Sequence, residues 1–153
     1  MAAGSKQKAR REALRLRRSM ARAEQMLAEL DRALLAPDGL CASDLEILER
    51  LVRKGSRPVN GLAKRVGLTS GSMTTAIQRL KKRGLVQGRR DLKDKRVVVV
   101  TATAEGQQLA KTMTQRRAES LLEVFSVWSD RERTVLLGLL KRLRRNKAAG
   151  RSD

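Results

Sequence analysis

The sequence predicts a mainly α-helical chain that carries one small β-hairpin. Apolar residues recur at helical spacings of three and four along most of the chain. Short helical segments in its middle are separated by glycines, and four successive valines at 97–100 form the clearest strand. With 153 residues, 41% of them hydrophobic, the chain can fill one core, and we expect a single domain over residues 1–153.

A long helix is expected first, from about Lys6 to Leu35, because this segment contains neither Gly nor Pro. Its apolar residues follow a heptad pattern, which is typical of helices that pair with other helices. We expect residues 1–35 to form a basic arm and a first dimerisation helix, and the Pro and Gly that follow end it. The heptad residues are Leu16, Met20, Ala23, Leu27, Leu30 and Leu34.

Three short helices should follow the long one. The first two are expected at about 42–54 and 59–66, where Gly55 and Gly67 supply stop signals. Hydroxyl groups at 69–72 are suited to cap the third helix, which ends at the glycine at 84. Three short helices joined by tight turns predict a helix-turn-helix.

A β-hairpin is expected directly after these helices. The segment 85–90 leads into the polar stretch Asp91 to Lys95, and the valine-rich segment 96–101 returns as the second strand. A helix-turn-helix followed by such a hairpin is a winged helix-turn-helix, which we expect over residues 38–103.

Two more helices should complete the chain. The first begins after Thr103 and carries an apolar face that includes Phe125 and Trp128. Ser129 and Glu132 match a capping box, which predicts the start of the last helix. We expect C-terminal dimerisation helices over residues 104–147 and a tail over 148–153.

The charge of the chain indicates a polyanionic partner. Lys and Arg number 35 against 16 Asp and Glu, which gives a formal net charge of +19. Segments 1–22, 79–96 and 141–151 carry +7, +7 and +6, so the excess lies in three blocks rather than evenly over the surface. Defined surfaces that meet double-stranded nucleic acid are therefore expected.

The residue types that the chain lacks exclude several classes of function. The absence of His excludes His-assisted catalytic triads, His general bases and nearly all zinc sites with mixed ligands. Phe125 and Trp128 are the only aromatic residues, which disfavours proteins that stack single-stranded bases on exposed rings. We therefore expect no enzyme activity, no cofactor and no metal site.

The cellular location is expected to be the prokaryotic cytoplasm, with the protein associated with the nucleoid. A single cysteine, Cys41, forms no intramolecular disulfide, and the basic start of the chain lacks the apolar stretch of a signal peptide. No apolar run is long enough to cross a membrane. A helix that lies on a membrane surface at the basic N-terminus stays open as an alternative.

The third short helix has the composition of a DNA recognition helix. At about 100° per residue, its small, polar and basic residues share one face, while Met73, Ile77 and Leu80 lie on the other. Small residues allow close approach to the major groove, Gln and Arg can bond base edges, and hydroxyls can reach phosphates. The candidate DNA-binding residues are Ser70, Gly71, Ser72, Thr74, Thr75, Gln78, Arg79 and Lys82.

The tip of the hairpin is the second candidate DNA-binding segment. Five of the eight residues at 89–96 are basic, a density suited to crossing a phosphate backbone and entering the minor groove. Asp91 and Asp94 are unfavourable near phosphates, so we expect them to shape the turn or to orient a neighbouring Arg. The candidate residues of this wing are Arg89, Arg90, Lys93, Asp94, Lys95 and Arg96.

These segments together resemble the MarR (multiple antibiotic resistance regulator) family over roughly residues 38–145. The resemblance implies a winged-helix transcription factor, usually a repressor, that dimerises through its first and last helices and binds pseudo-palindromic operators. It also implies that Asp94 pairs with a basic side chain to brace the wing and that Arg96 enters the minor groove. The similar stretches are LTSGSMT at 68–74, RL at 79–80, RGLV at 83–86, RRD at 89–91, DKR at 94–96 and TAEG at 103–106.

The chain departs from that family in three respects. Its first helix begins with a far more basic arm. Many members bind aromatic effectors, whereas this chain has no Tyr or His to help hold one, so a small-molecule effector is left unidentified. Cys41 lies at the start of the second helix rather than in the first, and we expect it to be a small, semi-buried residue rather than a redox sensor.

The function predicted from the sequence is that of a homodimeric, sequence-specific regulator of transcription that binds double-stranded DNA. An architectural, largely nonspecific DNA-binding protein of the same fold is the alternative, since phosphate contacts supply affinity to both. An RNA-associated basic protein is disfavoured by the lack of stacking aromatics.

Overall fold

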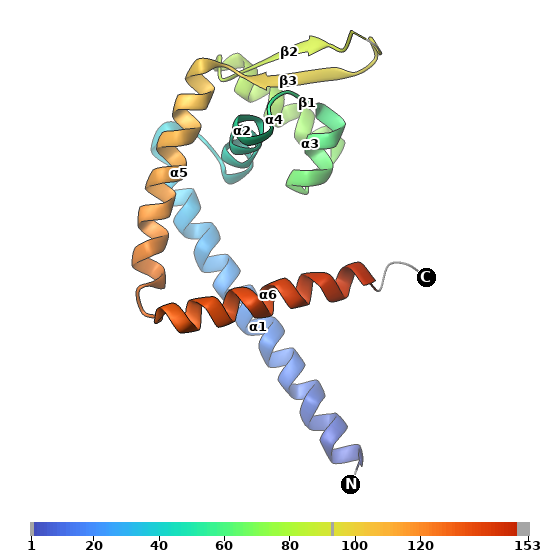
Figure 1. Ribbon diagram of the computed structural model, residues 1–153, viewed down its shortest axis with the longest axis vertical. Coiled ribbons are helices and arrows are strands. Elements are labelled where there is room, and N and C mark those ends of the chain that lie inside the picture. The colour runs from blue at the N-terminus through green and yellow to red at the C-terminus, as the bar shows by residue number, and fades with distance from the viewer. Residues whose placement is uncertain (1, 93, 150–153) are drawn as a thin grey trace. The chain divides into compact units, whose positions relative to one another are not determined.

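The computed structural model describes residues 2–92 and 94–149 and confirms the predicted fold class, helices with a small antiparallel sheet (Figure 1). In chain order the elements are α1 (Ala2–Leu35), the 3-10 turn η1 (Ala36–Asp38), α2 (Ala42–Lys54), β1 (Arg57–Pro58), α3 (Val59–Val66), α4 (Ser70–Lys82), β2 (Val86–Arg90), β3 (Val98–Ala102), α5 (Ala104–Phe125) and α6 (Asp130–Ala149). Residues 150–153 of the predicted tail lie outside the described residues.

Helix α1 begins at Ala2 rather than near Lys6, helix α6 continues to Ala149 and so into the predicted tail, and three further features differ from the sequence prediction. Strand β1 was not predicted, because two residues are too short to show a periodic pattern. Strand β3 begins at Val98 rather than at residue 96, since the hairpin turn continues through Val97. Helix α5 ends at Phe125, so Trp128 lies in the following turn, with its ring stacked on that of Phe125 at a centroid distance of 5.4 Å.

The chain divides into two compact units, Met1–Arg117 and Ala118–Asp153. The core of the first unit is formed by apolar side chains from α2, α3, α4, β3 and the first half of α5. They include Leu45, Leu48, Leu62, Met73, Leu80, Leu85, Val100 and Met113. Burying side chains of this size contributes about 1.5–3 kcal/mol each, so these helices hold the winged helix together.

Helix α1 joins this core only through its C-terminal end. Leu35 is fully buried, and Asp31 is bound by Arg117, whose Nε donates to the carboxylate at 2.8 Å. Residues 4–26 of the same helix are all exposed within the chain, including Leu16 and Met20. Most of the predicted dimerisation helix therefore has no partner inside its own unit.

The three strands form one antiparallel sheet in the order β1-β3-β2. Strand β2 pairs with β3 from Val86 opposite Ala102 to Arg90 opposite Val98. Val99 and Val100 of β3 are buried, so the valine run anchors the hairpin to the core and leaves its tip free. The wing thus extends from a fixed base.

The start of α5 requires a glycine at position 106 because the backbone of Leu85 lies close to it. A Cβ atom there would lie 2.0 Å from the carbonyl oxygen of Leu85, far inside contact distance. Thr103 holds this approach in place, since its hydroxyl donates to the Gly84 carbonyl at 2.7 Å and accepts from the Gly106 N–H at 3.1 Å. The α5 start is therefore packed directly against the chain that leads into β2.

We expect Gly106→Ala to lower the free energy of unfolding by about 2–3 kcal/mol, because overpacking in a fixed site costs this much. Gly61→Ala in α3 is the matched control, since nothing lies within 4 Å of its added Cβ and Ala favours a helix. Urea unfolding of both variants measures the difference. Equal stabilities of the two variants would show that the backbone at Leu85 shifts to accommodate the added Cβ without a measurable cost in free energy.

The second unit contains the end of α5 and all of α6. The predicted capping box is present: the Ser129 N–H and hydroxyl both donate to Glu132, at 2.8 and 2.7 Å. The hydrogen bond from the Ser129 hydroxyl has the larger effect and the bond from its backbone N–H the smaller, and both lower the pKa of Glu132. Large apolar side chains of α6 are nevertheless exposed, among them Val135, Leu137, Leu139, Leu140 and Leu143.

No helix in the described part of the chain combines the length and hydropathy that crossing a membrane requires.

Candidate nucleic-acid interface

Helix α4 presents the predicted polar face to solvent. Its N-cap is Thr69, whose hydroxyl oxygen accepts from the Ser72 N–H at 3.2 Å and fixes the start of the helix. Met73, Ala76, Ile77 and Leu80 form its buried face. The eight candidate residues of this helix are all exposed on the opposite face, as the sequence predicted.

Two threonines on the exposed face have their hydroxyl protons already engaged. Thr74 donates to the Ser70 carbonyl at 2.9 Å, and Thr75 donates to the Gly71 carbonyl at 3.2 Å. Each side chain therefore offers a methyl group and an acceptor oxygen to a partner, rather than a donor. Such groups fit a thymine methyl or the amino group of cytosine or adenine in the major groove.

Arg79 differs from its neighbours, because its guanidinium binds a buried carboxylate of α2. Nη2 donates to Oδ1 of Asp44 at 2.6 Å, and Nε donates to Oδ2 at 3.1 Å. The Asp44 side chain is only 1% exposed, whereas that of Arg79 is 41% exposed. The hydrogen bond to Asp44 raises the pKa of Arg79, the opposing effect of burial being smaller. This forked pair ties helix α4 to α2.

The same carboxylate also caps the start of α2. Oδ2 of Asp44 accepts from the backbone N–H of Cys41 at 3.1 Å, and the Cys41 Sγ lies 3.2 Å from Nη2 of Arg79. Cys41 is exposed, which corrects the semi-buried position predicted for it. Asp44 therefore joins the N-terminus of one helix to the side chain of another.

The tip of the wing is shaped by its two aspartates. Asp91 Oδ1 accepts from the Asp94 N–H at 3.2 Å, and Asp94 Oδ1 accepts from the Arg96 N–H at 2.9 Å. Asp94 therefore braces the turn through backbone bonds, and the described residues show no ion pair to its carboxylate; its pairing with a basic side chain stays a prediction. Both acids act as turn residues, which is one of the two roles expected of them.

The basic side chains of the wing lie around this turn. Arg89 and Arg90 extend from the end of β2, and Lys95 and Arg96 follow Asp94. All four are exposed, and none forms an ion pair in the described part of the chain. Lys93, the remaining wing candidate, lies outside the described residues.

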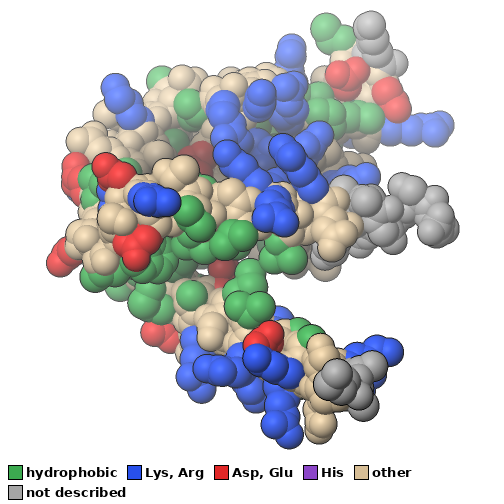
Figure 2. Space-filling view, turned by 60° about the horizontal axis from the view of Figure 1, so that its bottom comes forward, with side chains coloured by type: hydrophobic (Ala, Val, Ile, Leu, Met, Phe, Trp, Pro, Cys, Tyr) green, Lys and Arg blue, Asp and Glu red, His purple; other side chains and the backbone are tan. Residues whose placement is uncertain are grey.

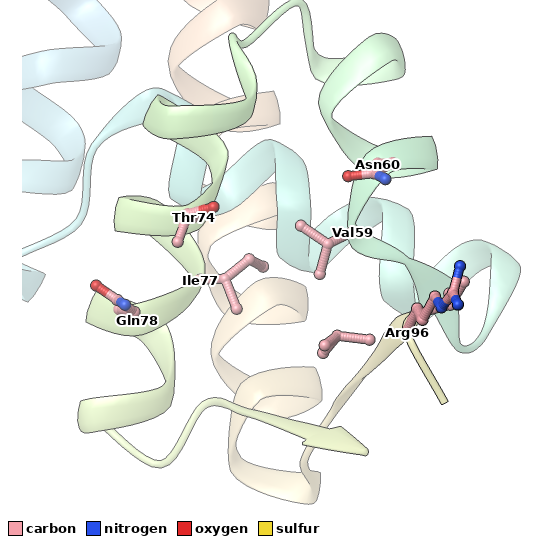
Figure 3. Close-up of a pocket in the computed structure, with 8 residues that line it drawn as sticks. Val59, Asn60, Thr74, Ile77, Gln78 and Arg96 are labelled. Atoms are coloured by element: carbon pink, nitrogen blue, oxygen red, sulfur yellow. The ribbon is translucent and has the colours of Figure 1, made fainter. Parts of the chain in front are cut away.

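A cavity of about 280 Å³ separates the recognition helix from the base of the wing (Figure 3). Ile77 from α4 and Val59 from α3 point toward each other across it. Thr74, Gln78, Asn60 and Arg96 supply its polar edge. Asn60 was not among the predicted residues, because nothing in its local sequence distinguishes it from an ordinary helix surface position. The structure places it in the lining of the same cavity as Arg96.

Positive charge is widespread on the molecule. On the face drawn in Figure 2, Lys and Arg side chains gather in patches and outnumber the Asp and Glu side chains. The described residues contain no cluster of His, Cys, Asp and Glu suited to hold a metal ion. The exposed polar helix, the basic wing and the hairpin base define a winged-helix protein of the DNA-binding class.

Comparison with known proteins identifies the family. The model of the MarR family matches residues 40–98. The transcriptional regulator BldR from Sulfolobus solfataricus is 30% identical, with a TM-score of 0.75 over 88% of this chain and 96% of that one. The chain belongs to the MarR family, whose members are transcriptional regulators and not enzymes.

Two further relatives agree with this assignment. The uncharacterized HTH-type transcriptional regulator YdgJ of Bacillus subtilis (strain 168) is 28% identical over 108 residues, which is 71% of this chain and 66% of YdgJ, just under two thirds. BpsR of Bordetella bronchiseptica, whose DNA binding is regulated by 6-hydroxynicotinic acid, is 25% identical with a TM-score of 0.74 over 83% of this chain and 91% of that one. The chain is thus a DNA-binding regulator of transcription.

Proposed function

We propose that this regulator is a repressor that binds a pseudo-palindromic operator as a homodimer, with one winged helix on each half-site. The observation that carries the proposal is the fixed placement of α4, whose polar face is exposed while Asp44 and Arg79 hold the helix to α2. A recognition helix held in this way can present the same side chains to every operator.

The exposed residues of α4 divide into three proposed roles. Thr75 and Gln78 form no bonds to other elements among the described residues and are proposed to contact base edges. Arg79 is proposed to orient the helix, because two donor nitrogens of its guanidinium are already bound to Asp44. Lys82 and the hydroxyls at the start of the helix are proposed to contact phosphates.

The wing is proposed to reach the minor groove that flanks each half-site. Arg96 lines the cavity that separates α4 from β3. When α4 occupies the major groove, Arg96 is proposed to lie near the sugar-phosphate backbone that separates the major groove from the minor groove. Narrow, A/T-rich minor grooves attract an arginine in this position.

Dimerisation is proposed because α1, α5 and α6 each expose large apolar side chains that no other part of their own unit buries. Leu16 and Met20 of α1, Leu122 of α5, and Leu139 and Leu143 of α6 are all exposed. Soluble monomers rarely expose so much apolar surface, and pairing with a second copy would remove it from water.

A small-molecule effector is a further proposed partner, by analogy with BpsR. A cavity of about 600 Å³ in the first unit is large enough for a small organic molecule and is lined by Leu85, Leu109, Met113, Arg83 and Arg116 among others. Arg83 and Arg116 are matched in this lining by Asp38 and Glu105, and Arg116 pairs with Asp38 at 3.3 Å, so the charge of the lining selects neither an acidic nor a basic effector.

Selection of bound sequences from a random DNA pool tests the function. We expect the wild-type protein to enrich an inverted repeat with half-sites about one helical turn apart. Thr75→Ala with Gln78→Ala should alter the enriched bases inside the half-sites. Arg96→Ala should keep those bases, lose the preference for flanking A/T pairs and weaken binding by about 1–3 kcal/mol.

The architectural alternative makes a different prediction for the same experiment. A nonspecific protein would enrich no repeat, and its affinity for selected and scrambled duplexes would be equal at physiological salt. That result would overturn the proposed repressor.

A further inference from the structure

The N-terminal half of α1 carries a straight stripe of basic side chains that the winged helix does not use. Five residues recur at spacings of three and four along one face of the helix. At about 1.5 Å per residue they form a line about 21 Å long. We call Lys8, Arg11, Arg15, Arg18 and Arg22 the basic stripe.

The basic stripe is available for a partner. All five side chains are exposed, and none forms an ion pair within the described part of the chain. Taking about 100° per residue, the stripe lies about 120° around α1 from the apolar line that begins at Leu16. Pairing the apolar line with a second copy would therefore leave the stripe facing solvent.

The stripe is also distant from the DNA-reading elements of its own unit. Helix α1 is attached at Leu35 and Asp31, and Lys8 lies about 40 Å along the helix axis from this attachment. Within the unit Met1–Arg117, the N-terminal end of α1 and the wing between β2 and β3 lie at opposite ends (Figure 1). DNA held by α4 and the wing is out of reach of the same subunit's stripe.

We propose that the basic stripe binds a second DNA duplex while α4 and the wing hold the first. An α-helix fits the major groove, and duplex DNA carries one phosphate charge per about 1.7 Å of its axis, so a line of five cations faces phosphates along its whole length. The proposal adds to the operator binding proposed above and does not depend on its sequence specificity.

Duplex DNA fits this surface better than a membrane does. Residues 2–13 contain no apolar side chain larger than Ala, whereas helices that lie in lipid insert Trp, Phe or Leu opposite their basic face. The bulky apolar residues begin at Leu14, and from Leu16 onward most of them follow the line proposed for dimerisation.

A bridging assay with the full chain tests the proposal. An operator-containing duplex is immobilised, protein is added, and capture of a fluorescent duplex of scrambled sequence is measured; a second arm immobilises a scrambled duplex instead. The stripe variant is Arg11→Gln with Arg15→Gln and Arg18→Gln. The control, Lys6→Gln with Arg10→Gln and Arg17→Gln, removes the same charge from the other flank of α1.

We expect the wild-type protein and the control to capture the second duplex, and the stripe variant to capture at least tenfold less. Affinity for a single operator duplex should change less than threefold in the stripe variant, and circular dichroism should show unchanged helicity. The log–log slope of capture against salt concentration should flatten by about 0.9 for each phosphate that the stripe variant no longer neutralises.

Four results would overturn the proposal. The first is that the wild-type protein captures no second duplex, and the second is that the stripe variant still captures it, which would assign bridging to the two winged helices of a dimer. The third is that the stripe variant and the control lose capture equally. The fourth is that the operator affinity of the stripe variant falls in parallel with its capture. If the selection from a random DNA pool yields no inverted repeat but capture of the second duplex still depends on the basic stripe, the proposed repressor function is wrong. The proposed second DNA-binding surface is then still supported.

Discussion

Replacing Arg79 with Ala is expected to lower the free energy of unfolding by about 2–3 kcal/mol. Removing one partner of a buried ion pair costs about 3–5 kcal/mol, because the remaining charge stays buried without compensation. The value is reduced here because the Arg79 side chain is 41% exposed, so solvent screens part of the interaction. Chemical denaturation of the variant and the wild-type protein provides the measurement.

Three variants separate this effect from a general loss of charge. Lys82→Ala removes an exposed cation of the same helix and should change stability by less than about 0.5 kcal/mol. Arg79→Lys keeps the charge but not the forked geometry, so it should recover only part of the loss. The double variant Arg79→Ala with Asp44→Ala should lose less free energy of unfolding than the sum of the losses in the two single variants, because either single change already breaks the pair.

The same variants test the proposed role of Arg79 at the operator. An orienting residue should leave the preferred bases unchanged when it is replaced, although affinity falls because α4 is held less firmly. A change in the preferred bases with little loss of stability would show that Arg79 reads DNA directly, as its outward position in the sequence first indicated.

Placing lysines on the apolar face of α6 is expected to give monomers that bind the operator at least 100-fold more weakly. Leu139 and Leu143 lie one turn apart and are exposed within the chain, so Leu139→Lys with Leu143→Lys would charge the proposed interface without disturbing a core. Two linked half-sites commonly add a factor of 10² to 10⁴ in affinity, and this factor is lost in a monomer.

The opposite face of α6 offers a matched control. Thr134→Lys with Gly138→Lys adds the same charge at the same spacing, and nothing lies within 4 Å of a Cβ at Gly138. Light scattering should give about twice 17.1 kDa for the wild-type protein and the control, and about half that value for the interface variant. A monomeric wild-type protein, or a stable dimer of the interface variant, would refute the proposed interface.

The helices of the winged helix-turn-helix were predictable because their signals are local. Gly55, Gly67 and Gly84 have positive φ angles in the structure, which glycine adopts more readily than other residues. Thr69 and Ser129 cap their helices through bonds to residues three positions away. Periods of three and four then fixed which face of each helix is buried.

The Asp44 and Arg79 pair was not predictable, because the two residues lie 35 positions apart and each has an ordinary local explanation. An acid in the first turn of α2 suits the helix dipole, and an arginine on the polar face of α4 suits DNA. Only the packing of α2 against α4 brings the carboxylate and the guanidinium within 2.6 Å.

The sequence by itself determined the order of the elements, the faces that are buried, and the blocks of positive charge, since these follow from spacing and composition. The tertiary structure alone decided which cations remain free for DNA and which are bound within the protein. It also showed that the basic half of α1 extends away from the wing. The reason is physical: ion pairs and surface separations depend on distances between segments remote in the chain, and residue spacing carries no such distance.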